Sequence, residues 1–274
     1  MRPPYPIEGA ISWNMNTICN YRCSYCTQRF VDNRKKWARD LPAFVRAFSH
    51  FAGDWELKLS GGEPFRHPNF LDAVEKLAQS GMRISVVSNF SSPKSHLEAF
   101  ASATAQKPGI FSASLHLEYV KPQEFLQKLT WFRSIYSGSI SVTCVATRKN
   151  MPALPALKDM FADFRFKVQP EKQDRDVIAY TPDEKKFLLD LGGHNLTGEI
   201  APNFKGRLCW AGSRYLIVDH LGEAYRCYPA RRYRREYLGN VLTSNFRLSF
   251  EPKTCLYEYC NCTVPQSRSM MMRS

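Results

Sequence analysis

Alternating strand-like and helix-like segments in the first 170 residues predict an α/β fold, a partial (βα)6 TIM-like barrel. Three observations carry this prediction. Short apolar runs rich in β-branched residues recur, segments with helical spacing separate them, and six such runs precede residue 171. This order is typical of a parallel sheet with right-handed crossovers. Six units are fewer than the eight of a complete (βα)8 barrel.

The expected elements follow in chain order. Strands are expected at 10–16, 55–62, 82–91, 109–116, 139–148 and 165–170. Helices are expected at 40–52, 67–81, 95–104, 121–138 and 151–164. Gly81 occupies the C-cap position of the second helix. Cys144, within the fifth strand, is expected to be a buried small hydrophobe.

The pattern changes near Thr181, where we expect the chain to leave the barrel. Thr181 and Glu184 have the spacing of a capping box and predict a helix over 181–192. Two short apolar runs around Asp219 and Gly222 predict a β-hairpin. The expected parts are a barrel at 1–180, a linker helix at 181–199 and a small cysteine-rich domain at 200–274.

The composition is that of a protein with one sizeable core. The chain has 274 residues, 44% of them hydrophobic, and no apolar run of about 18 residues that would predict a transmembrane helix. Its N-terminus has no apolar segment typical of a secretory signal. We therefore expect a cytoplasmic protein, in the host cytoplasm if the source is viral, with no membrane partner.

Nine cysteines need a chemical explanation in a reducing compartment. An odd number cannot pair completely within one chain, and disulfides are rare in the cytosol. Cys19, Cys23 and Cys26 have the spacing C-x3-C-x2-C. A structural zinc site or a [4Fe–4S] cluster normally takes four ligands. Three thiolates therefore either recruit a distant ligand or leave a coordination position open.

This spacing, with Tyr25 before the last cysteine and in the loop after the first expected strand, resembles the signature of radical S-adenosylmethionine (SAM) enzymes. The resemblance implies that the three cysteines hold a [4Fe–4S] cluster whose open iron binds SAM. In that family the reduced cluster cleaves SAM to methionine and a 5′-deoxyadenosyl radical, which abstracts hydrogen from a substrate. The alternatives are a chance triplet and a zinc site.

Polar motifs at the ends of the next strands are similar to those of the same family. LSGGEPF, at the end of the second strand, resembles its SAM-binding GGE motif, and Ser88 and Asn89 end the third strand. Open α/β sheets bind ligands at this edge. His116, after the fourth strand, belongs to the site or is a structural histidine. The resemblance implies a SAM site made of Tyr25, Gly61, Gly62, Glu63, Pro64, Ser88, Asn89, Ser114 and His116.

Five further cysteines lie near the C-terminus: Cys209, Cys227, Cys255, Cys260 and Cys262. Their order, C-x12-G-x4-C followed by C-x4-C-x-C, resembles the auxiliary-cluster domains of radical SAM enzymes, called SPASM and twitch. The usual closing C-x2-C of a twitch domain is absent. The resemblance implies one auxiliary [4Fe–4S] cluster, held by the first two cysteines and two of the last three. A zinc site is the alternative, because four thiolates suit zinc equally.

Basic and aromatic residues indicate an anionic substrate. The net charge is +13, and a second basic segment at 34–39 follows the first cysteine loop. Arginine forks bind phosphates, and tyrosines stack on bases. The alternative is a solvated basic loop. The predicted contacts of a polyanion are Arg231, Arg232, Arg234 and Arg235, which lie with Arg226 in one basic stretch interleaved with tyrosines.

The sequence therefore predicts a radical SAM enzyme that acts on an anionic substrate. The first hypothesis is a base in DNA or RNA, rearranged by isomerisation in nucleic acid hypermodification. The alternatives are a ribosomal-peptide maturase and a carbohydrate or aminoglycoside dehydrogenase, and the rival outside enzymes is a zinc-dependent nucleic-acid-binding module. A reducing partner such as flavodoxin or ferredoxin is expected. No catalytic base is assigned.

Overall fold

Six parallel strands form the framework of the computed structural model, which describes residues 8–51, 54–173, 176–191, 203–258, 260 and 270–272. Neighbouring strands follow the chain order, so each crossover returns the chain to the next position in the sheet. This architecture confirms the predicted α/β fold with a partial barrel. The strands are β1 (Gly9–Asn16), β2 (Trp55–Gly61), β3 (Arg83–Ser88), β4 (Pro108–Leu115), β5 (Ser139–Ala146) and β6 (Arg165–Pro170).

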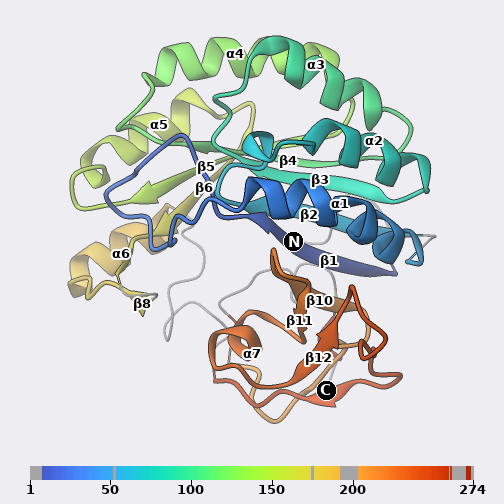
Figure 1. Ribbon diagram of the computed structural model, residues 1–274. Helices are drawn as coiled ribbons and strands as arrows, with labels where there is room; N and C mark the ends of the chain where they lie inside the picture. Colours follow the sequence, from blue (N-terminus) through green and yellow to red (C-terminus); the bar gives the residue numbers. More distant parts are fainter. Residues whose placement is uncertain are drawn as a thin grey trace.

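Five helices occupy the crossovers and lie together on one side of the sheet (Figure 1). Short 3-10 turns at Pro64–Arg66 and Met151–Ala153 precede two of them. In the described residues, no helix is both long enough and apolar enough to cross a bilayer. The helices are α1 (Arg34–Ser49), α2 (Phe70–Gln79), α3 (Lys94–Ala103), α4 (Pro122–Ile135) and α5 (Leu154–Met160).

The first helix begins six residues before its predicted start. Pro42 lies inside the helix, at its ninth residue. Trp37 decides the true extent, since its ring is buried and continues the apolar stripe of Leu41, Phe44 and Phe48. The basic segment 34–39 therefore forms the first six residues of α1.

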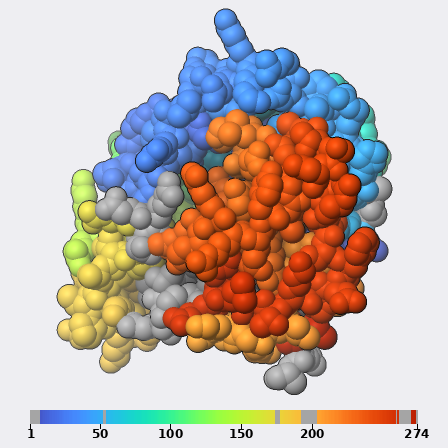
Figure 2. All heavy atoms as spheres, turned by 60° about the horizontal axis from the view of Figure 1, so that its bottom comes forward, coloured from blue at the N-terminus to red at the C-terminus, as the bar shows by residue number. Residues whose placement is uncertain are grey.

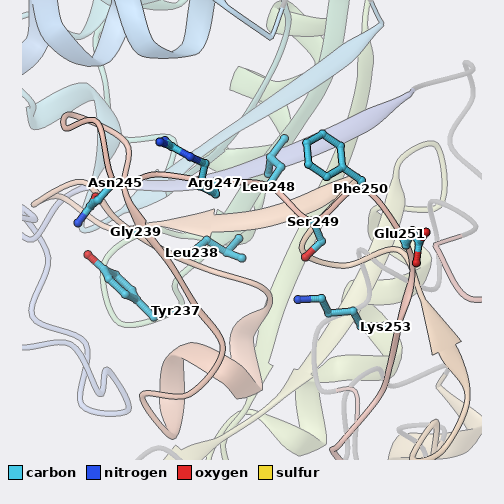
Figure 3. A pocket seen from close by; sticks show the side chains of 10 residues that line it. All are labelled: Tyr237, Leu238, Gly239, Asn245, Arg247, Leu248, Ser249, Phe250, Glu251 and Lys253. Atoms are coloured by element: carbon cyan, nitrogen blue, oxygen red, sulfur yellow. The ribbon is translucent and has the colours of Figure 1, made fainter.

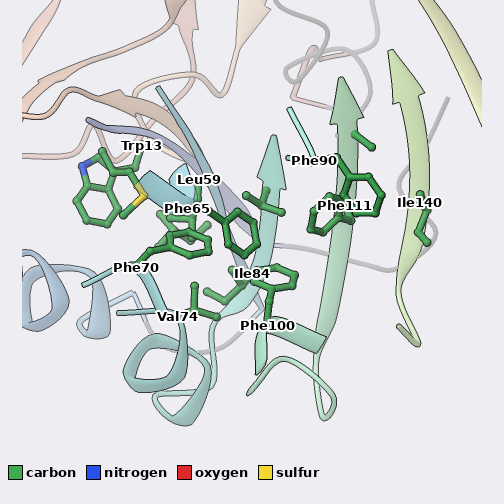
Figure 4. Packing of buried hydrophobic residues seen from close by; sticks show 14 of the residues in the cluster. Trp13, Leu59, Phe65, Phe70, Val74, Ile84, Phe90, Phe100, Phe111 and Ile140 are labelled. Atoms are coloured by element: carbon green, nitrogen blue, oxygen red, sulfur yellow. The ribbon is translucent and has the colours of Figure 1, made fainter. Parts of the chain in front are cut away.

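Aromatic side chains fill the space between the sheet and the helices. Burial alternates along β4, where Phe111 is fully buried and its neighbours in the sequence are half-exposed. The Phe111 ring centroid lies 4.8 Å from that of Phe132 on α4 and 5.5 Å from that of Phe100 on α3. Figure 4 shows the same packing around Phe65 and Phe70. This core holds the crossover helices against the sheet. It therefore also sets the positions of the strand ends, where the polar motifs lie.

The C-terminal part of the chain extends the sheet of the barrel. Strand β10 (Tyr215–Val218) pairs in parallel with β1, and β11 (Glu223–Tyr225) and β12 (Tyr237–Asn240) follow antiparallel, which makes nine strands. The predicted hairpin around Gly222 is thus confirmed. The remaining short elements are β9 (Leu208–Cys209), α7 (Tyr228–Arg232) and β13 (Lys253–Thr254), of which α7 lies beside the hairpin in Figure 1. Figure 2 shows the C-terminal residues gathered on one face of the molecule, next to N-terminal residues.

Helix α6 (Pro182–Asp190) joins the two parts, after a short β7–β8 pair (Lys172–Gln173 and Asp176–Val177). The predicted capping box is present, because the Thr181 hydroxyl accepts from the Glu184 N–H and the Glu184 carboxylate accepts from the Thr181 N–H. Residues 192–199 of the predicted linker lie outside the described residues. The predicted boundary at residue 200 stays a prediction.

Candidate functional site

The three clustered cysteines open onto one cavity at the carboxyl ends of the strands. They lie in the loop that follows β1, and the cavity measures about 220 Å³. Loops after β2, β3 and β4 complete its wall, as expected for the ligand-binding edge of a parallel sheet. Seven residues predicted for the SAM site line the cavity: Tyr25, Gly61, Gly62, Ser88, Asn89, Ser114 and His116.

Glu63 and Pro64, also predicted to bind SAM, are buried and do not line this cavity. The Glu63 carboxylate accepts from the Ser88 hydroxyl at 2.8 Å, the Asn89 N–H at 2.6 Å and the Phe65 N–H at 3.2 Å. Burial raises its pKa to about 7, although these donors oppose the shift. In this arrangement Glu63 ties the end of β3 to the loop after β2.

Gly61 and Gly62 allow a close approach of two backbone segments. Gly61 has a φ of +132°, and a Cβ on Gly62 would lie 1.8 Å from the carbonyl oxygen of Ile18. The Glu63 N–H donates to the same oxygen at 2.7 Å. Glycines at such a position let the backbone approach a ligand closely. The glycines also admit the start of the cysteine loop itself.

Cys19 has two N–H donors directed at its sulfur. The Tyr21 backbone N–H lies 3.3 Å from Sγ and the Asn89 side-chain amide lies 3.6 Å from it. Burial raises the pKa of the Cys19 thiol, while these two donors oppose the shift because they favour the thiolate. Such N–H donors to sulfur are typical of iron–sulfur ligands.

Cys23 contacts the histidine whose role the sequence left open. His116 Nδ1 lies 3.3 Å from Cys23 Sγ and 2.7 Å from the Tyr25 hydroxyl. Burial lowers the pKa of His116 to about 4, so the imidazole is neutral at pH 7 and its Nδ1 can accept a hydrogen bond. His116 is therefore a site residue that orients Tyr25 and Cys23.

Two residues to which the sequence assigned no role, Glu118 and Tyr119, connect the cysteine loop to the barrel. Glu118 accepts from the Ser24 N–H at 3.0 Å, and the ring of Tyr119 stacks on that of Tyr21 with centroids 4.1 Å apart. Glu118 and Tyr119 come shortly after His116 at the end of β4, and this position in the sequence could have indicated that they lie near the cysteine loop. Further cavity-lining residues outside the predicted set are Tyr21, Gln28, Phe30, Ser60 and Val87.

Four of the five C-terminal cysteines line a second, smaller cavity: Cys209, Cys227, Cys255 and Cys260. Cys262 lies outside the described residues. The free space measures about 20 Å³, which is roughly the volume of one water molecule and too small for a cluster without rearrangement. Across the described parts of the chain, no three thiol, imidazole or carboxylate groups converge closely enough to hold a metal ion, so either cysteine site needs its side chains to move.

The predicted polyanion contacts do not all lie at the surface. Arg234 and Arg235 are exposed, and Arg231 and Arg232 on α7 are half-buried. Arg226, in the same basic stretch, differs from these four arginines because its side chain is only 3% exposed. The sequence could not distinguish it, since all five arginines lie in one basic stretch.

A surface groove of about 650 Å³ lies between β12 and residues 245–253. Figure 3 shows Tyr237, Arg247, Phe250 and Lys253 around it. Phe250 is 97% exposed and Tyr237 is 47% exposed. The groove therefore presents two aromatic rings, two cations and the carboxylate of Glu251 to solvent.

The comparison with known families concerns the region around the first cavity. Residues 13–135 match the family model described as the Radical SAM superfamily. A curated relative, the probable GTP 3′,8-cyclase of Thermococcus kodakarensis, is 29% identical over 110 residues. The match covers 39% of this chain and 34% of that relative, so the chain spans about a third of its length.

Two solved structures share most of the fold. SuiB of Streptococcus suis has 13% sequence identity and a TM-score of 0.61, over 86% of this chain and 64% of that chain. The structure of anSMEcpe with bound AdoMet and Cp18Cys peptide has 15% identity and a TM-score of 0.56, over 86% and 78% of the two chains. At these identities the likeness establishes the architecture alone.

Proposed function

We propose that this chain is a radical SAM enzyme that reductively cleaves SAM and abstracts hydrogen from an anionic substrate, a proposal supported by the match of residues 13–135 to the Radical SAM superfamily model. One observation carries the proposal. Cys19, Cys23 and Cys26 line a single cavity together with the double-glycine loop and the ends of β3 and β4. The donor set fits a [4Fe–4S] cluster with one open iron, because it supplies three thiolates and no fourth.

The residues of the cavity have separate tasks in this proposal. When bound and reduced, the cluster supplies the electron that cleaves SAM to methionine and a 5′-deoxyadenosyl radical. Asn89 and the Tyr21 N–H stabilise negative charge on the Cys19 sulfur. Polar Ser114 and the Ser60 side chain offer hydrogen bonds to SAM, and Gly61 and Gly62 leave the wall open beside them.

An anionic substrate, with a base in DNA or RNA as the first choice, is supported by charge. Exposed Arg234 and Arg235 and the groove with Arg247 and Lys253 offer phosphate contacts, and Phe250 offers a ring for stacking. The relative named as a GTP 3′,8-cyclase acts, by its name, on an anionic nucleotide. Isomerisation of such a base is the reaction we propose.

Peptide maturation is the second candidate. The neighbours SuiB, also solved with its precursor peptide SuiA, and anSMEcpe, solved with a peptide, support it through a shared architecture. A carbohydrate or aminoglycoside dehydrogenase is the third candidate, and a zinc-dependent nucleic-acid-binding module is the candidate without catalysis. The four thiols of the second cavity support an auxiliary [4Fe–4S] cluster, with zinc as the alternative occupant. A flavodoxin or ferredoxin is proposed as the reductant.

Anaerobic reconstitution tests the enzymatic proposal. We expect a brown protein with about eight irons if both clusters form, and 5′-deoxyadenosine when SAM and a reductant are added. Cys19→Ala should abolish SAM cleavage, whereas Cys144→Ala should retain it, because Cys144 is buried on β5 and does not line the cavity. A colourless zinc protein that cannot cleave SAM would reject the proposal.

Binding measurements distinguish the substrate classes. Affinity for single-stranded DNA or RNA should fall steeply with salt, because binding to phosphates releases counterions. Arg234→Ala with Arg235→Ala should weaken it, while Arg133→Ala on α4 serves as a matched exposed control. Absence of binding even at low salt would exclude nucleic acid and favour a peptide.

A further inference from the structure

Arg226 is a buried arginine immediately before Cys227. Its side chain is 3% exposed, although arginine is almost never fully buried unless it is paired. A guanidinium has five N–H donors in a fixed planar fork. Each of the five has an acceptor here, so the charge is fully satisfied by the protein.

Four of the acceptors are backbone carbonyls on two separate segments. Nε donates to Ala211 at 2.8 Å, and Nη2 donates to Cys209 at 3.3 Å and to Lys253 at 2.5 Å. Nη1 donates to Thr254 at 2.9 Å and to the Glu236 carboxylate at 2.5 Å. One side chain thus connects the segments that flank the second cavity.

These bonds attach three cysteines to one rigid group. The Cys209 carbonyl is itself an acceptor, the Thr254 carbonyl is bonded to the nitrogen of Cys255, and Cys227 follows Arg226 in the chain. Pairing of β9 with β13 adds a second connection, since Lys253 lies opposite Cys209. All three cysteines line the same small cavity.

We propose that Arg226 is the positioning residue of the C-terminal cysteine site and holds Cys209, Cys227 and Cys255 in place for a metal ion or cluster. The proposal rests on the C-terminal cysteine site proposed above. Binding then requires side-chain rotations that bring the three thiols and a fourth together, while Arg226 keeps their backbone segments in place. Lysine cannot replace the fork, because an ammonium group has three donors at one point and cannot span both segments.

The test uses cobalt(II) as a probe of thiolate geometry in the full-length chain, with Cys19, Cys23 and Cys26 all changed to Ser. The thiolate-to-cobalt absorption band reports the C-terminal site alone. Arg226→Lys should weaken cobalt binding by about 10- to 100-fold, the usual effect of losing a group that orients metal ligands. Arg214→Lys, an exposed arginine of the same region, is the matched control and should bind like the parent.

Two outcomes would overturn the proposal: a parent protein that binds no cobalt, or Arg226→Lys with unchanged cobalt affinity, even if its melting temperature falls. A second measurement keeps folding separate from positioning. In the otherwise native chain, Arg226→Lys should lose about four of about eight irons and still cleave SAM at the N-terminal site. Loss of SAM cleavage in the unmodified protein would instead reject the proposed function, while leaving the cobalt result valid.

Discussion

At the scale of single residues, the cysteine loop depends on positions that carry no reactive group. Gly62 has no room for a side chain, because the Ile18 carbonyl lies where its Cβ would be. Glu63 is buried against the end of β3, so its carboxylate sets the separation of two loops. The ligands of the site are therefore arranged by backbone packing beneath them.

Gly62→Ala should displace the cysteine loop, because the added methyl group would lie 1.8 Å from a backbone oxygen that cannot rotate away. We expect a cost of about 1–3 kcal/mol in unfolding free energy and loss of most of the N-terminal iron. Gly81→Ala is the control, since Gly81 has a φ of +88° but nothing within 4 Å of an added Cβ. It should lower stability and keep the iron. Full iron content in Gly62→Ala would contradict this account.

His67 should make stability depend on pH. It is 4% exposed, its Nδ1 accepts from the Asn69 N–H, and burial lowers its pKa to about 4. The unfolded chain, with an ordinary pKa near 6.5, therefore binds more protons between pH 4 and 6.5, and stability falls as the pH falls. The loss attributable to His67 reaches about 3 kcal/mol at pH 4.

Urea unfolding from pH 4.5 to 7.5 measures this dependence. His67→Gln should flatten the profile, whereas His50→Gln, at an exposed position, should reproduce that of the parent. If the unfolding free energy of the parent and of His67→Gln changed equally with pH, His67 would not be the source of the pH dependence.

At the scale of elements, β4 shows how a strand pattern supports the site. Its buried residues face the aromatic core, and the strand ends where Ser114 and His116 reach the cavity. Period-two burial was readable from the sequence because strand side chains alternate between faces. The start of α1 was not, because Trp37 is recognised as part of the stripe only when its contact partners are known. Its ring lies beside His67 and its Nε1 donates to His220 Nδ1 at 3.4 Å.

Phe111→Ala on β4 should cost about 3–5 kcal/mol in unfolding free energy, because it leaves a cavity among Phe100, Phe132 and their neighbours. Phe250→Ala, which removes a ring that is 97% exposed, should change stability by no more than about 0.5 kcal/mol. Urea titration of both variants gives the comparison. A cost below about 1 kcal/mol for Phe111→Ala would contradict the packing described.

At the scale of the whole molecule, the C-terminal part and the barrel share one sheet. Leu216 and Val218 of β10 belong to the main hydrophobic core, while Ile217 between them faces the cluster around Cys209 and Cys227. A strand that contributes to two cores couples them mechanically. We therefore expect both parts to unfold together.

Leu216→Ala should destabilise the protein by about 2–5 kcal/mol and retain a single unfolding transition. Hydrogen exchange of amides in β1 and β2 should accelerate with it, because β10 pairs directly with β1. Leu256→Ala, at a position 56% exposed, is the control. Unchanged exchange in β1 would indicate that the C-terminal part opens as an independent unit.

The sequence by itself determined the order of strands and helices and the C-x3-C-x2-C loop after β1. Of the nine residues that it predicted for the SAM site, seven line the cavity. Periodicity and motif spacing are local properties, so one chain suffices to read them. Only the tertiary structure decided that β10 joins β1, that Glu63 is buried rather than cavity-lining, and that Arg226 lies between two cysteine segments instead of at the surface. Each of these depends on contacts between residues distant in sequence. Burial by a distant segment does not change the local periodicity of the sequence, so it cannot be predicted from that periodicity.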